Sequence, residues 1–349
     1  MLEETQVSIV TRIGLDLAKD VFQVHAVDAQ DEKVTNKQLK RKDLLQWFAK
    51  LERSDDCLVA MEACGSSHHW RRELEKLGYR TMAIPPAYVK PYVRTNKNDA
   101  NDARAICEAA SRPGMPTVRL KTVAEQDAMM LIKQRDGLVR ERTRQVNRIR
   151  GQLSEYGIFI CQGINTLRRK LPEILEDADN GLETLGRSLV QLSYDYIVGI
   201  DAQIELYENK IKELARSSAQ AQRLQTAPGI GPITAMTLIA QLGDMKQFAH
   251  ARSASEYLGV VPRQFSSGGK TVLGGISKRG NSQLRSLLIH GARSVLRVAR
   301  NKDDKLSRWA VSVAERRGNN VAAVAVANKL LRIVWAMQTK AQEYRVMTA

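Results

Sequence analysis

Apolar positions in the first third of the chain follow the two-residue period of strands and alternate with helical stretches. Two runs rich in β-branched residues, Val7–Asp16 and Val21–Val27, precede a third near Lys33–Leu39, and their short connections predict an antiparallel meander. Beyond it, the pattern predicts helices over 42–51, 66–77 and 98–110 and strands over 57–61 and 79–84. Strands that alternate with helices indicate one α/β domain over residues 1–118.

The middle of the chain, residues 119–222, has the longer period of a helical seam. Apolar residues recur every seven positions from Ile132 to Leu153, and spacings of three and four continue from 182 to 214. We therefore predict an α-helical insertion with two long coiled-coil helices, paired within the chain or with another protomer. The exposed faces of the first helix carry the arginines Arg135, Arg140, Arg142, Arg144, Arg148 and Arg150. Because few acids accompany them, we favour a basic rod for a phosphate backbone over a solvated coiled-coil face.

Residues 223–349 have the pattern of an all-α domain. The segment Thr226–Ala235 reads TAPGIGPITA and leads into an apolar helix, which matches a helix-hairpin-helix with Gly229 and Gly231 before the helix start. In that motif, backbone N–H groups hold a nucleic-acid phosphate without reading its sequence. The alternative is a plain connection between two helices, which the doubled glycines and the basic composition make less favourable.

Charge narrows the choice of partners. The 349-residue chain has 54 basic and 38 acidic residues, and the net charge of +16 favours a nucleic-acid partner over a membrane. The apolar run Val321–Met337 contains Asn328, Lys329 and Arg332, so we predict a buried helix there and no membrane span. The four cysteines form no CxxC pair, which is typical of reduced thiols in a cytoplasmic protein.

Four acids of the α/β domain form a candidate metal site. Asp16 lies inside an apolar strand, where a lone carboxylate is unfavourable, and Glu62 closes the predicted strand CLVAM. Asp99 and Asp102 are three residues apart at a helix start, so both side chains can face one way. Together they suit Mg²⁺, which prefers carboxylate and water ligands. The structural alternatives are that Asp99 is an N-cap, that Asp102 favours the helix dipole and that Glu62 satisfies turn amides.

A second candidate site lies in the segment Gly259–Gly280, which reads GVVPRQFSSGGKTVLGGISKRG. Ser266 and Ser267 precede two glycines, and residues 257–302 carry nine Lys or Arg and no acid. One hypothesis is a serine nucleophile that attacks a phosphodiester. The basic residues that would neutralise charge at the phosphorus are Arg263, Lys270, Lys278 and Arg279. The other is a surface loop in a basic protein, and this segment alone favours the loop.

The combined motifs resemble one known family. The segments IGLDLAKDVFQVH, AMEACG, NDANDAR, APGIGPITA and the serine loop are similar, in this order, to the DEDD-type transposases of bacterial insertion sequences, which are bridge-RNA-guided serine recombinases. The resemblance implies an RNase H/RuvC-like domain over residues 1–118 that holds Mg²⁺ through Asp16, Glu62, Asp99 and Asp102. It also implies a C-terminal transposase domain over residues 223–349, in which Ser267 attacks DNA and forms a covalent 5′-phosphoserine.

The resemblance has further implications for partners and location. It implies donor and target DNA as substrates, a guide noncoding RNA that pairs with them, and a dimer or tetramer in which protomers share composite sites. It also implies action in the bacterial cytoplasm, at the nucleoid. Two readings of the same residues compete with it: a RuvC-like nuclease in which water attacks and the serine loop only binds phosphate, and a non-enzymatic scaffold whose acids are structural.

Overall fold

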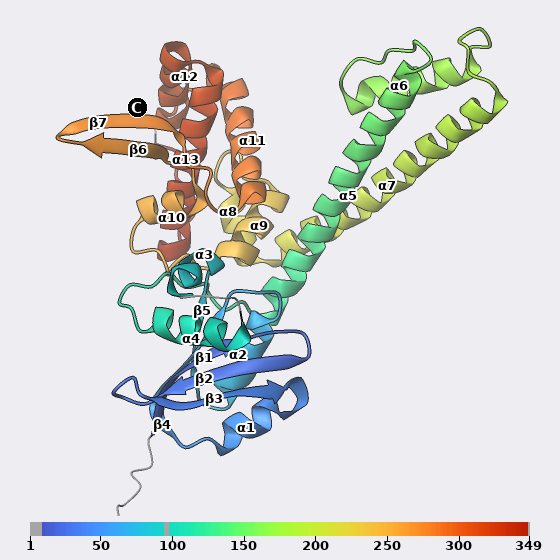
Figure 1. The fold of residues 1–349 in the computed structure, drawn as a ribbon. Coiled ribbons are helices and arrows are strands. Elements are labelled where there is room, and N and C mark those ends of the chain that lie inside the picture. Colours follow the sequence, from blue (N-terminus) through green and yellow to red (C-terminus); the bar gives the residue numbers. More distant parts are fainter. Residues whose placement is uncertain (1–8, 94–97, 348–349) are drawn as a thin grey trace, which may run out of the picture. The chain divides into compact units, whose positions relative to one another are not determined.

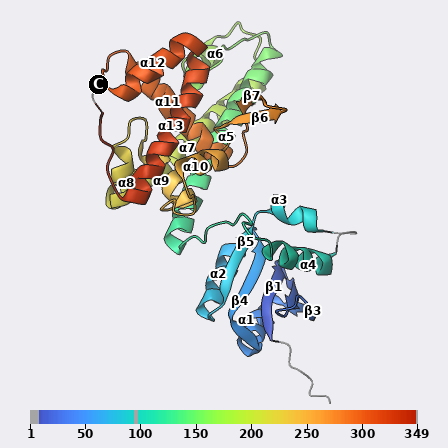
Figure 2. The same ribbon diagram turned by 90° about the vertical axis from the view of Figure 1, so that its left-hand side faces the viewer.

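The computed structural model describes residues 9–93 and 98–347. The chain divides into two compact units, residues 1–121 and residues 122–349, which we call the N-terminal unit and the C-terminal unit. Each unit has its own hydrophobic core. Figures 1 and 2 show the helices and strands of each unit.

The N-terminal unit is built on a five-stranded mixed sheet with the order β3-β2-β1-β4-β5. The strands are β1 Val10–Asp16, β2 Val21–Val27, β3 Lys33–Lys40, β4 Arg53–Glu62 and β5 Arg80–Ile84. The first three form an antiparallel meander, whereas β4 pairs in parallel with β1 and with β5. The predicted meander and α/β pattern are confirmed, although Val7 and Ser8 lie outside the described residues. This topology is compatible with a RuvC-like fold.

Helices cover both faces of this sheet. They are α1 Leu44–Lys50, preceded by the 3₁₀ turn η1 Arg41–Asp43, then α2 Ser67–Lys76, α3 Pro86–Val89, the 3₁₀ turn η2 Lys90–Tyr92, and α4 Asp99–Ala110. Figure 2 shows α1 and α2 on one side of the sheet and α4 on the other. Phe48 and Trp70 fill the first interface and Ile106 the second.

Helix α4 lies unusually close to strand β1. A Cβ atom placed on Gly14 would be 2.0 Å from the carbonyl oxygen of Ala103 and 2.8 Å from the Cβ of Cys107. Only glycine therefore permits this packing, and the approach brings the first turn of α4 beside the end of β1 at Asp16.

Two long helices of the C-terminal unit, α5 Val123–Ser154 and α7 Thr184–Ser217, lie side by side as a helical hairpin, with α6 Ile164–Glu176 near its tip (Figure 1). Thr122 and Glu125 form a capping box at the start of α5, which explains why the helix begins there. At the other end of the hairpin, Ile132 and Ile211 belong to the core of the C-terminal helices.

The arginines of α5 are largely satisfied within the hairpin. Arg135 forms an ion pair with Glu208 at 2.5 Å, and Arg142 forms one with Asp201 at 2.7 Å. Arg150 donates to the carbonyl oxygens of residues 161 and 163. The prediction of a basic rod is therefore wrong for Arg135 and Arg142, because their acidic partners lie on α7 rather than on α5.

Helix α7 has two apolar stripes. The residues that face the interior of the hairpin are Val190, Ile197, Ile200 and Ile204. A second stripe, which we call the exposed α7 stripe, stays in solvent and consists of Leu185, Leu189, Leu192 and Tyr196. The predicted seam mixed the two, because both repeat with spacings of three and four residues.

The remainder of the C-terminal unit is helical, as predicted, except at one hairpin. Its elements are α8 Ala219–Gln225, α9 Pro232–Leu242, α10 Ala251–Leu258, β6 Pro262–Ser267, β7 Lys270–Ile276, α11 Ser282–Ala299, α12 Lys305–Arg317 and α13 Asn319–Lys340. The all-α prediction is wrong for residues 262–276, where β6 and β7 pair antiparallel. Figure 1 shows this hairpin extending from the helices.

Helix α13 is the one helix within the described residues that is long and apolar enough to cross a membrane. It contacts α10, α11 and α12, and Leu330, Leu331 and Val334 on it are fully buried in the core. Its apolar composition is therefore explained by packing inside the C-terminal unit, in agreement with the predicted buried helix.

The contact at Gly14 predicts a sharp difference between two glycines. Gly14→Ala is expected to destabilise the protein by about 3 kcal/mol or more, because the added methyl group overlaps the backbone of α4. Gly137→Ala is the matched control: residue 137 lies within α5 with no atom within 4 Å of its added Cβ, so about 0.5–1 kcal/mol of stabilisation is expected. Urea unfolding of both variants measures the difference, and equal midpoints would refute the close packing of α4.

Candidate metal centre and serine hairpin

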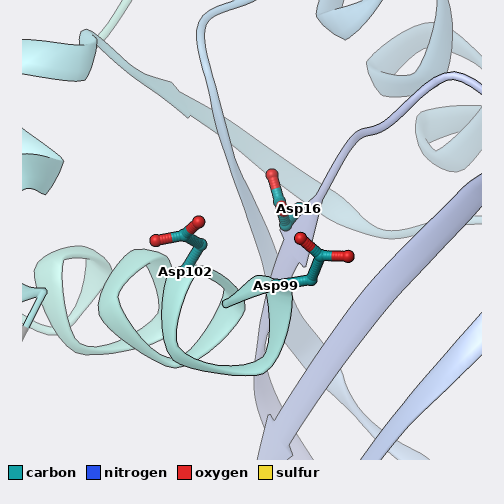
Figure 3. A group of neighbouring side chains, drawn as sticks. All are labelled: Asp16, Asp99 and Asp102. Carbon is teal, nitrogen blue, oxygen red and sulfur yellow. The ribbon is translucent and has the colours of Figure 1, made fainter. Parts of the chain in front are cut away.

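The sheet and α4 bring three predicted ligands together. Asp16 is the last residue of β1, and Asp99 and Asp102 lie in the first turn of α4. Carboxylate oxygens of all three lie within 4.8 Å of one another (Figure 3). Asp16 is half-buried, which is consistent with its position at the inner end of the strand.

The N-cap of α4 is Asn98, not Asp99. The Asn98 side chain accepts a hydrogen bond from the backbone N–H of Asn101 at 2.8 Å. The alternative interpretation of Asp99 as the cap is therefore wrong. Because the neighbouring asparagine performs the capping, the two aspartates do not need to cap the helix, and Figure 3 shows them grouped with Asp16.

Glu62 lies beside this group rather than within it. It ends β4, whose preceding residue Met61 pairs with Leu15 of β1, so Glu62 is next to Asp16 across the sheet. Its charge contributes to the raised pKa of Asp16. The structure therefore places all four predicted acids in one region, with three of them in mutual contact range.

Electrostatics make the cluster unfavourable without a cation. The pKa of Asp16 is raised to about 6, first by burial and then by the charges of Asp102, Asp99 and Glu62. Burial and like charges both disfavour the ionised carboxylate. A divalent cation would relieve this repulsion, and a set made only of carboxylate oxygens is the chemistry of a hard ion such as Mg²⁺. The residues present thus fit a metal ion.

The predicted serine loop is the end of a two-stranded hairpin. Gly268 and Gly269 form its two-residue turn with φ of 55° and 77°, the combination that a type I′ turn requires. Ser267 is the last residue before the turn and pairs with Lys270. The Ser266 hydroxyl accepts a hydrogen bond from Gln264 at 3.0 Å. Both serines are exposed, and the two hydroxyls differ because that of Ser266 is engaged along the strand.

The four basic residues of this segment are not equivalent. Lys270 lies opposite Ser267. Arg263 is four residues from Ser267 along an extended strand, roughly 13 Å at about 3.3 Å per residue. Lys278 and Arg279 follow β7 at the base of the hairpin, which is the end opposite the turn. There the Lys278 N–H donates to the Gly259 carbonyl. Of the four, Lys270 is therefore the one placed for direct contact with a phosphate at Ser267.

The glycines of the predicted helix-hairpin-helix have different surroundings. Gly229, with φ of 78°, packs on Gly291 of α11, and a Cβ on Gly229 would lie 2.5 Å from the Gly291 carbonyl oxygen. Gly231 is the N-cap of α9 and has open space around it. Gly229 thus has a packing role, whereas the backbone at Gly231 is the part of this connection that is open to a phosphate.

Sequence reasoning missed one polar residue beside the carboxylates. Gln23 pairs directly with Asp16 across β1 and β2, is 5 % exposed, and its side-chain amide donates to Asn36. Gln23 is a polar residue within the apolar run VFQVHAV, and the same pattern, a polar residue within an apolar strand, identified Asp16. The sequence therefore carried a signal for Gln23 as well. His68, by contrast, accepts a hydrogen bond from the backbone N–H of Lys121.

Comparisons with known proteins match both parts of the chain. A family model described as "Transposase IS116/IS110/IS902 family" matches residues 221–307, and a DEDD transposase model for IS110 elements matches residues 13–158. The chain is 45% identical to the transposase of insertion sequence element IS1111A from Coxiella burnetii, over 95% of this chain and 91% of that protein. It is 45% identical to a probable family 20 transposase of Pseudomonas aeruginosa, over 96% and 98%. It is 39% identical to the IS1328 transposase of Yersinia enterocolitica, over 95% and 97%.

The raised pKa of Asp16 predicts a pH-dependent stability. A folded pKa of about 6 against an ordinary value of 3.8 destabilises the folded state as pH rises between these values. Without metal at pH 8, Asp16→Asn is therefore expected to raise the free energy of unfolding by about 1 kcal/mol, a value discounted for the partial exposure of the carboxylate. The gain should shrink toward pH 4 in thermal melts. A lower melting temperature of the variant at pH 8 would show that Asp16 has a structural role.

Proposed function

The chain belongs to the IS116/IS110/IS902 family of transposases, and we propose that it cuts and rejoins DNA through a covalent phosphoserine at Ser267. Membership makes DNA its substrate and insertion-sequence transposition its activity, and the DEDD pattern implies dependence on a divalent metal. The observation that supports strand cleavage is the convergence of Asp16, Asp99 and Asp102 from two separate elements, and the pairing of the exposed Ser267 with Lys270 supports the serine as nucleophile.

The carboxylates supply one half of the proposed chemistry. Asp16, Asp99 and Asp102, with Glu62 beside them, would hold Mg²⁺. When bound, Mg²⁺ polarises the phosphate and lowers the cost of deprotonating a nucleophile. The cluster's own contribution is to keep its oxygens close together before the ion arrives, at the cost in stability described above.

Ser267 supplies the other half. Its hydroxyl oxygen forms a bond to phosphorus while the bond to the 3′ oxygen breaks, so the DNA keeps a free 3′ hydroxyl and the 5′ phosphate stays on the serine. The Lys270 ammonium group, on the residue paired with Ser267, favours the negative charge of that phosphate. Attack by another 3′ hydroxyl reverses the step and rejoins strands without ATP, because the phosphodiester energy is conserved.

The partners follow from the same proposal. Residues 223–349 act as the transposase domain, with Gly231, Arg263, Lys278 and Arg279 contacting nucleic acid, while residues 119–222 form the helical region. We assign sequence choice to an element-encoded guide RNA, in the bacterial cytoplasm at the nucleoid. A dimer or tetramer is supported by the exposed α7 stripe, since its four large apolar side chains, between 50 and 72 % exposed, repeat with coiled-coil spacing.

One observation favours a second candidate function. Within the described residues, no hydrogen bond joins the Ser267 hydroxyl to a histidine or a carboxylate that could act as a base. A metal-dependent nuclease that uses water would need only the carboxylate cluster. In that case the hairpin would bind phosphate without reacting.

The serine variants separate these two functions. Ser267→Ala is expected to abolish a denaturant-stable protein–DNA adduct on a nicked suicide substrate and to lower strand transfer by about 10³-fold or more. Ser266→Ala is the matched control, because it removes a hydroxyl group from the preceding residue. It should keep both the adduct and strand transfer. Denaturing gels with labelled DNA measure the adduct. Wild-type cutting and rejoining by Ser267→Ala would leave the nuclease as the function.

The carboxylates predict how activity depends on metal and pH. Chelation by EDTA and Asp16→Asn should each abolish strand cleavage but leave DNA binding intact. At limiting metal, cleavage should increase as pH rises through about 6, because Asp16 must lose its proton before it can ligate a cation. Cleavage assays across this pH range test the expectation. Full strand cleavage by Asp16→Asn without added metal would show that the acids are structural.

A further inference from the structure

Four arginines, three on separate elements and one in a loop, line one cavity at the base of the serine hairpin. The cavity has a volume of about 670 Å³. The arginines are Arg252 of α10, Arg263 of β6, Arg279 after β7 and Arg332 of α13. These arginines cannot come from one amphipathic helix, and the sequence did not indicate Arg252 or Arg332 as phosphate ligands.

The positive charge of this cavity is only partly neutralised. Glu256 is the acid in its lining, and it forms an ion pair with Arg252 at 3.1 Å. Within the described part of the chain, Arg263, Arg279 and Arg332 have no carboxylate within ion-pair distance. The cavity therefore presents a net positive charge, which favours an anion.

The lining also offers a hydroxyl group. The Ser277 Oγ atom is buried and has no hydrogen-bond partner. Asn328, in contrast, is fixed, since its amide donates to the Val260 carbonyl at 3.0 Å. Guanidinium groups and a hydroxyl group are donors that match the several acceptor oxygens of a phosphate.

The arginines of the cavity lie toward the base of the hairpin, whereas Ser267 lies beside the turn at its tip. Arg263 lies at the cavity, roughly 13 Å from Ser267 along β6 at about 3.3 Å per residue. The base of the hairpin is held by the Ser277 N–H to the Val261 carbonyl at 2.9 Å and by Arg285, which donates to the carbonyls of Leu258 and Arg279. The spacing between cavity and serine is therefore set by a fixed strand.

We propose that the arginine cavity binds a second backbone phosphate of the DNA strand that Ser267 attacks. Because about 3.4 Å is the rise per nucleotide along the helix axis and each strand also winds around that axis, about 13 Å between two phosphates of one strand corresponds to about two to four nucleotides. The cavity thus fixes the register of the strand, and Ser267 meets one phosphodiester bond rather than its neighbours. This inference rests on the proposed function, because it assumes that Ser267 reacts with DNA.

Salt-dependent DNA binding tests the charge contact. In a Ser267→Ala background, which prevents covalent trapping, Arg332→Gln should make the slope of log K against log salt shallower by about one. Arg216→Gln, the same change at an exposed position at the end of α7 outside the cavity, should leave the slope closer to the parent value. Fluorescence anisotropy with a labelled mixed-sequence duplex measures both. Equal slopes for the two variants overturn the proposal. If Arg332→Gln lowers the melting temperature so far that binding cannot be measured, Arg252→Gln provides the same test.

The register is tested separately with neutral phosphate analogues. Single methylphosphonates placed along the suicide substrate should lower adduct formation by wild-type protein most strongly at one position about two to four nucleotides from the cleaved bond. In Arg332→Gln that position should lose its effect. If the effect is the same in both proteins, the phosphate is not held by the cavity. Inorganic phosphate that raises the melting temperature without competing with DNA would identify a site for free anions and overturn the assignment.

These outcomes distinguish the inference from the function on which it rests. An adduct at Ser267 together with an unchanged slope in Arg332→Gln refutes the cavity alone. A shallower slope without any adduct supports the phosphate contact and refutes the serine chemistry.

Discussion

The close approach of α4 to β1 at Gly14 is the contact on which the candidate metal centre depends. Without a side chain at residue 14, the helix backbone lies against the strand, and the first turn of α4 reaches the end of β1. Asp99 and Asp102 then meet Asp16 although more than eighty residues separate them in the chain. Asn98 caps the helix, so neither aspartate has to.

The approach of α4 to β1 also brings carboxylates close together, and their mutual repulsion indicates a functional site. Carboxylates within 4.8 Å of one another, one of them half-buried, repel each other and raise the pKa of Asp16. A purely structural cluster would pair such acids with arginines, as the helical hairpin pairs Arg142 with Asp201. Among the residues that the structure describes, Asp16, Asp99 and Asp102 have no such arginine partner, which is the arrangement of a site that receives a cation.

The C-terminal unit also uses glycines to bring backbones together. Gly229 packs on Gly291, and a Cβ on Gly259 would lie 2.2 Å from the Arg279 carbonyl oxygen. The second contact closes the base of the serine hairpin. Ser267 and Lys270 lie at the tip of that hairpin and the arginines of the cavity lie at its base, and these are the two positions that we propose to contact one bound strand.

The sequence by itself determined the α/β pattern, the long helices and the four acids, because strand and helix periods and an acid within an apolar run depend on residues close in the chain. The hairpin at residues 262–276 escaped prediction, since its exposed strands and Gly268-Gly269 turn have the composition of a loop. Only the tertiary structure decided which acids neutralise Arg135 and Arg142, and which arginines join Arg263 in one cavity. Those partners lie on other elements, and their meeting depends on how whole helices pack rather than on any local pattern.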